Sequence, residues 1–420
     1  MKILWITNLR LDVSKEGTYG GGWLTSLMNQ IRKHSDIELT VCYTDRNLRQ
    51  LRDETIDGVR HCGIPRHKNV LKYDNGVAST LCSIIDEFHP DIIHAQGTEN
   101  ANAIAAMRER PNYTYVVSIQ GLLSRYAEHY VGGVPFPYMF DLTPRDLLHR
   151  DGPISKGRKW AKASWYEIEM IEKANYVMAR TSWDVACVKH INRDVPIYSD
   201  LRVLRPAFYQ HEWKLEKCKR HSIFVGASNN QIKGLHFVLQ ALPLIRKVYP
   251  DTHLYISSRD FTKVNSLNDL IRYQTYFIYI KRLIKKLDLA DSVTFMGVLN
   301  EQKMSEAFTN AHAFILPSVI ENSPNTLSEA GVLGVPTVSS YIAGVPDLVE
   351  DGVNGFLYAY DEYYIMADRI IKIFDDDELA KKLSRNLREK ARKMYSAEKN
   401  TDLVYQAYLD IYRKQHNEQV

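Results

Sequence analysis

The chain has 420 residues, which is enough for two or three domains that each bury a hydrophobic core. It carries 54 basic and 50 acidic side chains, with no large excess of either sign in either half, and this excludes a polybasic nucleic-acid-binding arm. Hydrophobic residues make up 45% of the chain, a value typical of soluble globular proteins and not of disordered ones.

The cysteines and the amino terminus predict the cellular compartment. Five cysteines occur without a Cys-x-x-Cys pair, so we expect reduced thiols and no zinc site. Residues 1–7 lack the long apolar stretch of a signal peptide, and no run of about 18 apolar residues occurs in the chain. We therefore expect a cytoplasmic protein.

Short apolar runs alternate with helical patterns along the chain. In the first half the predicted strands are Lys2–Thr7, Ile37–Tyr43, Asp91–Ala95, Tyr113–Ile119 and Tyr176–Ala179. Helical patterns such as Trp23–Lys33 and Gly76–Phe88 lie between them. In the second half the predicted strands are His221–Gly226, Thr252–Ile256, Ser292–Gly297, Ala313–Leu316 and Thr337–Ser339. This alternation predicts two doubly wound α/β domains with parallel sheets, which bind ligands at the carboxyl ends of their strands.

Four segments follow from this pattern. We expect a first domain at 1–205, a hinge at 206–220 where Pro206 interrupts the pattern, and a second domain at 221–395. The segment 396–420 contains a helix with Val404, Ala407, Tyr408 and Ile411 on one face. That face needs a surface to pack on, and we expect it to return to the first domain.

The segment 321–329, with the sequence ENSPNTLSE, follows a predicted buried strand and holds the densest concentration of polar groups. Ser323 suits a helix N-cap, Pro324 the first helical position, and Gly334 the helix end. Free amides at such a helix start bind phosphate. Glu321 and Glu329 lie about 12 Å apart along a helical rise, which fits opposite ends of a sugar nucleotide. A capped helix with two surface acids fits the spacing equally well.

Three further segments allow a functional and a plain structural interpretation. In the dipeptide Lys233-Gly234, the lysine follows a predicted strand and can reach phosphate oxygens. The structural alternative is a solvated lysine at the start of a helix. Glycines at 17 and 20–22 let the backbone approach a phosphate or a sugar, or they form a flexible turn. The fingerprint G-x-G-x-x-G is absent, which argues against a nicotinamide dehydrogenase. Asp375–Asp377 is better explained as a helix cap than as a metal site.

The segment Arg145–Lys162 has six basic and two acidic side chains, with Trp160, Trp165 and Tyr166 nearby. Such a segment can contact anionic lipid head groups or a phosphorylated acceptor. It can also be a solvated helix face with buried tryptophans.

Taken in order along the chain, these segments resemble one enzyme family. They comprise Gly20–Gly22, Phe224–Gly226, Lys233-Gly234, Val293–Gly297, Glu321–Glu329, Gly331–Pro336 and Gly344–Asp347. Together they closely resemble the retaining glycosyltransferases of family 4, which have the GT-B fold of two Rossmann-like domains facing a cleft. The likeness covers essentially the whole chain and is strongest from His221 to about Tyr358.

The resemblance implies roles for individual residues. Glu321 would hold hydroxyls of the donor sugar and Glu329 those of the ribose, while Lys233 would neutralise the diphosphate. The remaining residues that it places in the donor pocket are Gly21, Gly22, Gly226, Val298, Leu299, Asn322, Ser323, Asn325 and Thr326. Val298 and Leu299 would contact the base, and Gly21 and Gly22 the reacting sugar. Such enzymes need no metal and no cofactor beyond the nucleotide sugar.

Two positions depart from the family pattern. Gly226-Ala227 stands where the family often has Gly-Arg, so one expected diphosphate cation is missing. Gln120 stands where the family often has His, and we expect it to position a substrate hydroxyl rather than accept a proton, because an amide does not titrate near neutrality. Lys233, Glu321 and Gln120 form the expected catalytic set.

The expected reaction is transfer of a sugar, with retention, from a UDP- or GDP-linked donor to a glycan or lipid-linked acceptor. The setting would be bacterial polysaccharide or glycoconjugate synthesis, in the cytoplasm or at the inner face of the membrane. Two alternatives are a nucleotide-sugar 2-epimerase of the same fold and a catalytically inactive sugar-nucleotide-binding subunit, the latter motivated by Ala227 and Gln120.

Overall fold

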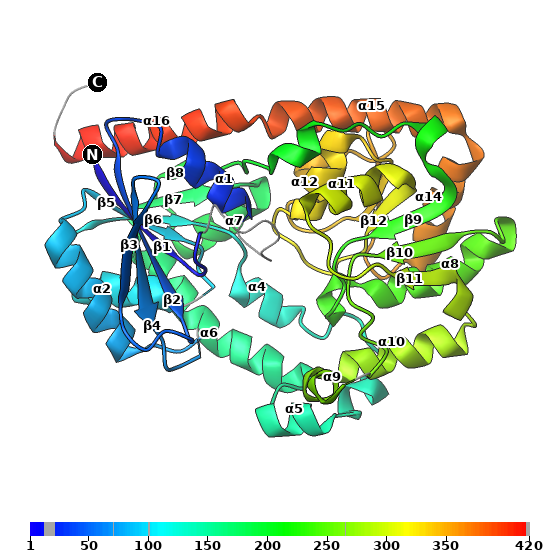
Figure 1. The fold of residues 1–420 in the computed structure, drawn as a ribbon. Helices are drawn as coiled ribbons and strands as arrows, with labels where there is room; N and C mark the ends of the chain where they lie inside the picture. Colours follow the sequence, from blue (N-terminus) through cyan, green and yellow to red (C-terminus); the bar gives the residue numbers. More distant parts are fainter. Residues whose placement is uncertain (12–21, 70, 100, 265, 417–420) are drawn as a thin grey trace. The chain divides into compact units, whose positions relative to one another are not determined.

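The computed structural model describes residues 1–11, 22–69, 71–99, 101–264 and 266–416, and the chain forms two compact units. The first unit contains Met1–Ser124, Lys159–Leu204 and Tyr395–Val420. The second contains Arg125–Arg158 and Arg205–Met394. Figure 1 traces the chain through both units.

The first unit is built on an eight-stranded sheet in the order β3-β4-β2-β1-β5-β6-β7-β8. Its strands are β1 (Lys2–Thr7), β2 (Glu38–Asp45), β3 (Arg52–Ile56), β4 (Val59–Pro65), β5 (Ile92–Gln96), β6 (Thr114–Ser118), β7 (Tyr176–Ala179) and β8 (Ile197–Ser199). Neighbouring strands run parallel, except that β3 pairs antiparallel with β4. The helices that contribute to this unit are α1 (Gly22–Ile31), α2 (Asn75–Phe88), α3 (Asn102–Glu109), α4 (Leu123–Glu128), α6 (Pro153–Lys173), α7 (Ser182–Ile191) and α16 (Ala397–Gln415).

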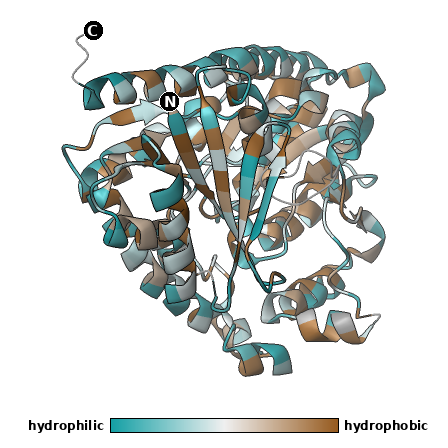
Figure 2. Cartoon of the chain, turned by 60° about the vertical axis from the view of Figure 1, so that its left-hand side comes forward, coloured by the Kyte–Doolittle hydropathy of each residue, from teal (hydrophilic) through white to brown (hydrophobic). Residues whose placement is uncertain are grey.

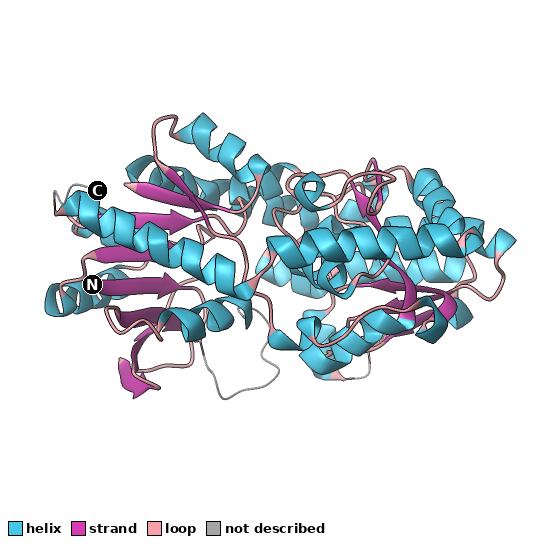
Figure 3. Cartoon of the chain, turned by 90° about the horizontal axis from the view of Figure 1, so that it is seen from above, coloured by secondary structure: helices cyan, strands magenta, loops and turns pink. Residues whose placement is uncertain are grey.

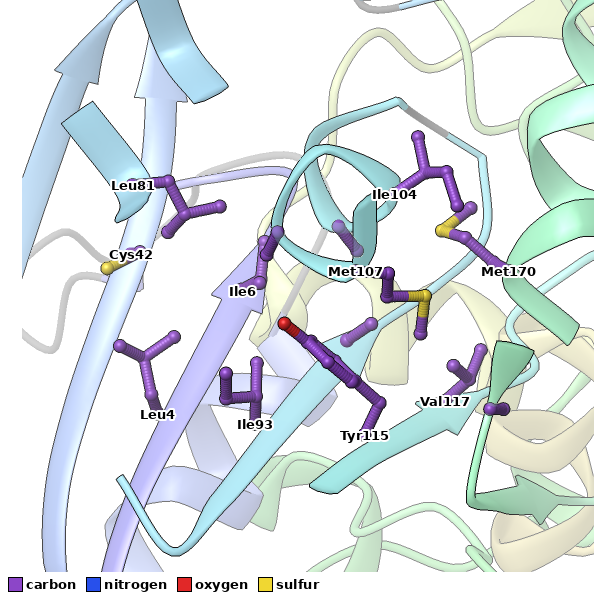
Figure 4. Close-up of a cluster of buried hydrophobic side chains, with 14 of the residues drawn as sticks. Leu4, Ile6, Cys42, Leu81, Ile93, Ile104, Met107, Tyr115, Val117 and Met170 are labelled. Atoms are coloured by element: carbon purple, nitrogen blue, oxygen red, sulfur yellow. The ribbon is translucent and has the colours of Figure 1, made fainter. Parts of the chain in front are cut away.

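Hydrophobic side chains cover both faces of this sheet, as a parallel sheet requires. Successive residues of β1 point to opposite faces, so Leu4 and Ile6 join one core cluster while Ile3 and Trp5 join the other. Figure 4 shows the first cluster, in which Leu4 and Ile6 pack with side chains such as Ile104. Hydrophobic stretches along several strands are visible in Figure 2.

Helix α16 packs on the first unit. Val404, Tyr408 and Ile411 are fully buried in the cluster that contains Trp5. The Trp5 indole Nε1 donates a hydrogen bond to the Tyr408 hydroxyl at 2.9 Å. The amphipathic pattern of the carboxyl-terminal segment therefore marks a helix that belongs to the unit in which the chain begins.

The second unit is built on a six-stranded, wholly parallel sheet in the order β11-β10-β9-β12-β13-β14. Its strands are β9 (Lys219–Val225), β10 (His253–Ile256), β11 (Val293–Phe295), β12 (Ala311–Leu316), β13 (Thr337–Ser340) and β14 (Phe356–Tyr358). Its helices are α5 (Pro144–His149), α8 (Leu235–Val248), α9 (Leu267–Arg272), α10 (Thr275–Lys286), α11 (Glu301–Asn310), α12 (Asn325–Leu333), α13 (Val345–Leu348), α14 (Tyr363–Asp375) and α15 (Asp377–Met394). In Figure 3 helices flank the strands of each unit.

The two units differ from the domains that we expect from the sequence, which end at residues 205 and 395 with a hinge at 206–220 between them. The segment 206–220, where we expect the hinge, is attached to the second unit. There Trp213 donates to the Leu333 carbonyl through its backbone amide and to the Ala311 carbonyl through its indole, both at 2.8 Å. Residues 125–158, which we placed in the first domain, belong to the second unit. The Asp146 carboxylate accepts a hydrogen bond from the Thr275 amide at 2.8 Å and so attaches that segment to α10.

Candidate functional site

The topology of the second unit places a candidate site between β9 and β12. The chain adds β10 and β11 on one side of β9, then crosses over to form β12 on the other side. At such a switch point two adjacent loops leave the sheet in opposite directions, which creates a ligand-binding crevice at the carboxyl ends of the strands. Gly226 follows β9, and the segment from Glu321 to α12 follows β12.

Helix α12 begins within this segment, one residue later than predicted. Pro324, and not Ser323, is the N-cap, because Pro324 has an extended backbone and its carbonyl accepts the first amides of the helix, from Leu327 and Ser328 at 3.1 Å. Pro324 provides no side-chain hydrogen bond to the helix amides. Asn325 is exposed and Thr326 is half-buried, so the positive end of α12 is accessible to an anion. Gly334 ends the helix with φ 78°, as predicted.

Lys233 and Glu321 form an ion pair beside this helix start. The Lys233 Nζ contacts the Glu321 Oε1, and the Ser318 hydroxyl donates to the same oxygen at 3.1 Å. Glu321 is buried, whereas the Lys233 side chain is 35% exposed. The structure thus brings together two residues that are 88 positions apart in the sequence, as expected for a shared donor site.

The backbone around Lys233 fixes the position of this lysine. Lys233 ends the 3-10 turn Gln231–Lys233, and the Val319 amide donates to the Ile232 carbonyl at 2.8 Å, which ties this turn to the loop after β12. Gly234 has φ 69°, and a Cβ there would lie 1.8 Å from the Pro317 carbonyl oxygen. Only glycine fits this position, so the dipeptide Lys233-Gly234 sets the lysine at the switch point.

Glu329 lies further along α12 and is paired with Arg205. The Arg205 Nη2 contacts the Glu329 Oε1 at 2.8 Å, and the guanidinium also stacks 4.9 Å from the Phe208 ring centroid. Glu329 is buried, whereas the Arg205 side chain is 30% exposed. No sequence motif marks Arg205, which lies 124 residues before its partner Glu329.

Five further predicted donor residues belong to the second unit and lie at loops of the same sheet edge. A Cβ at Gly226 would lie 2.9 Å from the Thr326 Cγ2, so the lack of a side chain lets the start of α12 approach the end of β9. Asn322 and Ser323 are buried in the loop before α12. Val298 and Leu299 follow β11, two strands from β9, where Val298 is exposed and Leu299 half-buried.

The first unit has a switch point of its own, between β1 and β5. Gln120 follows β6 on this edge, and its Nε2 donates to the Gln96 carbonyl at 2.9 Å. Gly22 is the first residue of α1. Gly21, with the rest of the glycine-rich loop at 12–21, lies outside the described residues.

A second residue at this edge, Glu99, was missed by the sequence analysis. It follows β5 and folds back over Gly97, which has φ 109°, and a Cβ on Gly97 would lie 2.3 Å from the Glu99 Oε2 and 3.3 Å from the Gln120 Cδ. Among the described residues the buried Oε2 has no hydrogen-bond partner. Burial raises the pKa of Glu99 to about 7, and the carboxylate of Glu167 adds to this shift. Glu99 lies three residues after the end of β5, and the sequence does not show that this acid is buried or that it lies at a switch point.

Asp375–Asp377 is a helix cap, as predicted. Asp375 ends α14, Asp377 begins α15, and the Asp376 carboxylate accepts from the amides of Glu378 and Leu379 at 3.0 and 2.9 Å. Within the described part of the chain no group of three or more His, Cys, Asp or Glu side chains could hold a metal ion.

The basic segment Arg145–Lys162 is only partly free for a ligand. Arg145 is paired with Asp146 at 3.1 Å and with Asp151 at 3.3 Å, and its side chain is largely buried. Trp165 is exposed, so the expectation of buried tryptophans does not hold there. None of the helices in the described ranges is long and apolar enough to cross a membrane.

Comparison with solved structures shows the fold. Sucrose-phosphate synthase from Thermosynechococcus elongatus superposes with a TM-score of 0.74 at 15% identity, covering 98% of this chain and 99% of that one. HepE from Anabaena, solved with UDP-glucose, superposes with a TM-score of 0.64 at 16% identity and covers 98% of this chain and all of that one. These likenesses confirm the predicted GT-B fold.

Curated relatives match parts of the chain. N-acetyl-alpha-D-glucosaminyl L-malate synthase of Bacillus anthracis is 27% identical over 141 residues, which are 34% of this chain and 36% of that protein. Spore coat protein SA of Bacillus subtilis is 24% identical over 198 residues, 47% of this chain and 49% of that protein. D-inositol 3-phosphate glycosyltransferase of an Arthrobacter species is 26% identical over 309 residues, 68% of each chain. The chain thus aligns with half or less of the length of the first two.

The model of one protein family matches the part of the chain that contains the candidate site of the second unit. That family is described as glycosyl transferases group 1, and the match covers residues 208–394. The matched residues include β9, the Lys233-Gly234 dipeptide, Glu321 and all of α12. Residues 208–394 of this chain are therefore similar to the glycosyl transferases group 1 family.

Proposed function

We propose that this protein is a retaining glycosyltransferase that moves a sugar from a UDP- or GDP-linked donor to a glycan or lipid-linked acceptor in bacterial polysaccharide or glycoconjugate synthesis. The observation that carries the proposal is the accessible start of α12, with Lys233 and Glu321 on one side and Glu329 within the helix, inside a region that is similar to a glycosyltransferase family. HepE with UDP-glucose and TarM of S. aureus with UDP and alpha-GlcNAc-glycerol are solved complexes of the same fold, which supports a nucleotide sugar as donor.

The donor lies along α12 in this proposal. The diphosphate binds the amides at Asn325 and Thr326 and the Lys233 ammonium, because the helix start and the lysine both present positive charge. Glu329 accepts hydrogen bonds from the ribose, and Glu321 accepts them from the hexose. Val298 and Leu299 contact the base. Position 227 is Ala, where the family often has Arg. We therefore assign Lys233 alone as the cationic side chain that binds the diphosphate.

The reaction in this proposal proceeds by dissociation of the donor. The bond between the anomeric carbon and the diphosphate breaks through an oxocarbenium-like transition state, and Lys233 and the helix start stabilise the charge on the leaving diphosphate. The acceptor oxygen forms its bond on the same face. A covalent intermediate needs a free carboxylate on the opposite face. Glu321 already accepts from Lys233 and Ser318, and Glu329 is paired with Arg205, so we assign neither to that role.

The acceptor proton goes either to the departing phosphate oxygen or to a base in the first unit, where we propose Glu99. Below about pH 7 Glu99 is protonated and cannot accept a proton, and above it the carboxylate can. We expect kcat/KM to rise with pH through about 7. The Glu99→Gln variant should lack this rising limb of the pH profile. Gln120→Ala should lower turnover but keep the limb, because an amide does not titrate there. A pH profile of each variant tests this, and a limb that persists in Glu99→Gln would assign the proton to the phosphate.

We expect turnover to survive exhaustive chelation, because the groups assigned to the diphosphate are Lys233 and backbone amides. The measurement is donor consumption and product formation before and after treatment with excess chelator. Abolition of turnover, with rescue by magnesium or manganese, would contradict a metal-independent mechanism.

The proposal as a whole is tested with a panel of nucleoside diphosphates and their sugars. A ligand at 100 times its dissociation constant should stabilise the protein by about 2.7 kcal/mol, so thermal shifts identify the base. Incubation of the matching donors with candidate acceptors then distinguishes the outcomes. Donor consumption without an acceptor product would indicate an epimerase or a hydrolase, and tight binding without turnover a binding subunit.

A further inference from the structure

Two short helices of the second unit expose a group of large hydrophobic side chains. We call this group the α5–α9 surface, and it consists of Leu147, Leu148, Leu267, Leu270 and Ile271. Each has more than half of its surface exposed, and Leu148 and Leu267 are each 80% exposed. A cluster of exposed leucine and isoleucine side chains is unusual on a soluble domain and marks an interaction site.

Helices α5 and α9 are held in place, so the exposed side chains are part of a built surface. The two helices are in contact, and Figure 1 shows α5, α9 and α10 next to one another. The Thr143 hydroxyl, which caps α5, donates to the Tyr273 carbonyl at 2.8 Å. The buried Asp146 carboxylate of α5 accepts from both the amide and the hydroxyl of Thr275, at 2.8 and 2.7 Å. Asp141 pairs with Arg282 of α10.

Positive charge is concentrated in the same part of the sequence. Residues 259–286 contain seven lysines and arginines and two acidic residues, and two of the seven cations, Lys263 and Arg282, are paired with Asp260 and Asp141. Helix α10 has no acidic residue, and its buried face leaves Lys281, Lys285 and Lys286 exposed. Helix α10 is attached to α5 through Thr275, so an apolar surface and a helix with exposed lysines belong to one packed group of helices. This combination is complementary to an anionic bilayer, in which head groups attract the lysines and the interface accepts the apolar side chains.

We propose that the α5–α9 surface docks the protein on an anionic phospholipid bilayer. The five side chains enter the interface between head groups and acyl chains, and the lysines of α10 provide electrostatic attraction. A second copy of this chain fits less well, because a two-fold contact through this surface would bring the positive charges of two copies together. The surface shares Leu147 and Leu148 with the basic segment Arg145–Lys162, in which Arg145 is paired with Asp146 and Asp151.

Co-sedimentation with vesicles tests the proposal without any donor or acceptor, so its outcome is independent of the proposed transferase activity. Vesicles of phosphatidylcholine with phosphatidylglycerol should bind the protein, and vesicles of phosphatidylcholine alone should bind it at least tenfold more weakly. The double variant Leu148→Ser, Leu267→Ser should weaken binding to the anionic vesicles at least tenfold. Both side chains are largely exposed, so the fold should persist, which circular dichroism and Tm check.

Two further variants separate the contribution of the α5–α9 surface to vesicle binding from that of the lysines of α10. Val248→Ser changes an exposed apolar residue at the end of α8 and should bind like the unmodified protein. Lys285→Glu, Lys286→Glu should weaken binding at low salt, and this difference should disappear at about 1 M salt, where the Debye length is about 3 Å. Absence of binding to anionic vesicles at low salt, or unchanged binding of the double leucine variant, would overturn the proposal. So would a dimer in vesicle-free solution that the leucine variant dissociates, because it would assign the surface to a second copy.

Discussion

Lys233→Ala is expected to lower kcat by a factor of about 10² or more. The lysine is held at the switch point by the turn at 231–233 and by Gly234, so its charge is placed before the donor binds. Loss of a preorganised charge at a developing anion has an effect of this size. The effect should appear mainly in kcat, because the charge on the leaving diphosphate grows as the bond breaks.

The measurement is turnover at saturating donor, with two controls. Lys247→Ala removes an exposed lysine near the end of α8 and should leave kcat unchanged. Lys233→Arg keeps the positive charge and should recover part of the lost rate. Lys233→Ala also leaves the buried Glu321 without its cation, so Tm is recorded for each variant. A Lys233→Ala protein that folds and keeps kcat within about twofold would refute the assignment.

Glu329→Ala is expected to weaken nucleoside diphosphate binding by about 1.5–3 kcal/mol, or roughly 10- to 150-fold in Kd. The physical reason is the loss of a charged acceptor for the ribose hydroxyls. Isothermal titration with the diphosphate that gives the largest thermal shift measures this change. Glu321→Ala is the matched control, because it should keep the affinity for the diphosphate and damage use of the intact donor.

The Arg205 pair provides a second check on this assignment. Arg205→Ala should weaken binding less than Glu329→Ala, because the carboxylate remains in α12 and loses only the group that orients it. The double variant should bind about as weakly as Glu329→Ala alone, since two residues that act through one contact are not additive. Unchanged affinity in Glu329→Ala, or additive losses, would show that the carboxylate does not bind the nucleotide.

Much of the local structure follows from the sequence alone. The predicted strands Lys2–Thr7 and Tyr176–Ala179 match the structure residue for residue, because a short apolar run between helical patterns is typical of a buried parallel strand. The hairpin of β3 and β4 was not predicted, since β3 has the charged sequence RDETI and buries little. Its turn, Asp57-Gly58, has φ of 49° and 82°, and this dipeptide was the available signal.

The sequence also predicted the bounds of α12 to within one residue. The order Glu321, Pro324, Glu329 and Gly334 predicts a helix that starts beside one acid and contains another, because proline and glycine have fixed preferences at helix ends. The error of one residue at the N-cap arises because Ser323 and Pro324 both suit a helix start, and the tertiary position of the loop after β12 decides between them.

The tertiary structure alone decided which residues meet. Crossovers on opposite sides of β9 and of β1 create the two switch points, and strand order cannot be read from strand positions along a chain. The Arg205–Glu329 pair spans 124 residues, and Glu99 lies over Gly97 through the fold of one loop, so no local pattern marks either contact. Residues 125–158 belong to the second unit, where the Asp146 carboxylate accepts a hydrogen bond from the amide of Thr275 in α10, 129 residues later. Local preferences depend on near neighbours in sequence, whereas these contacts depend on how whole helices and strands pack.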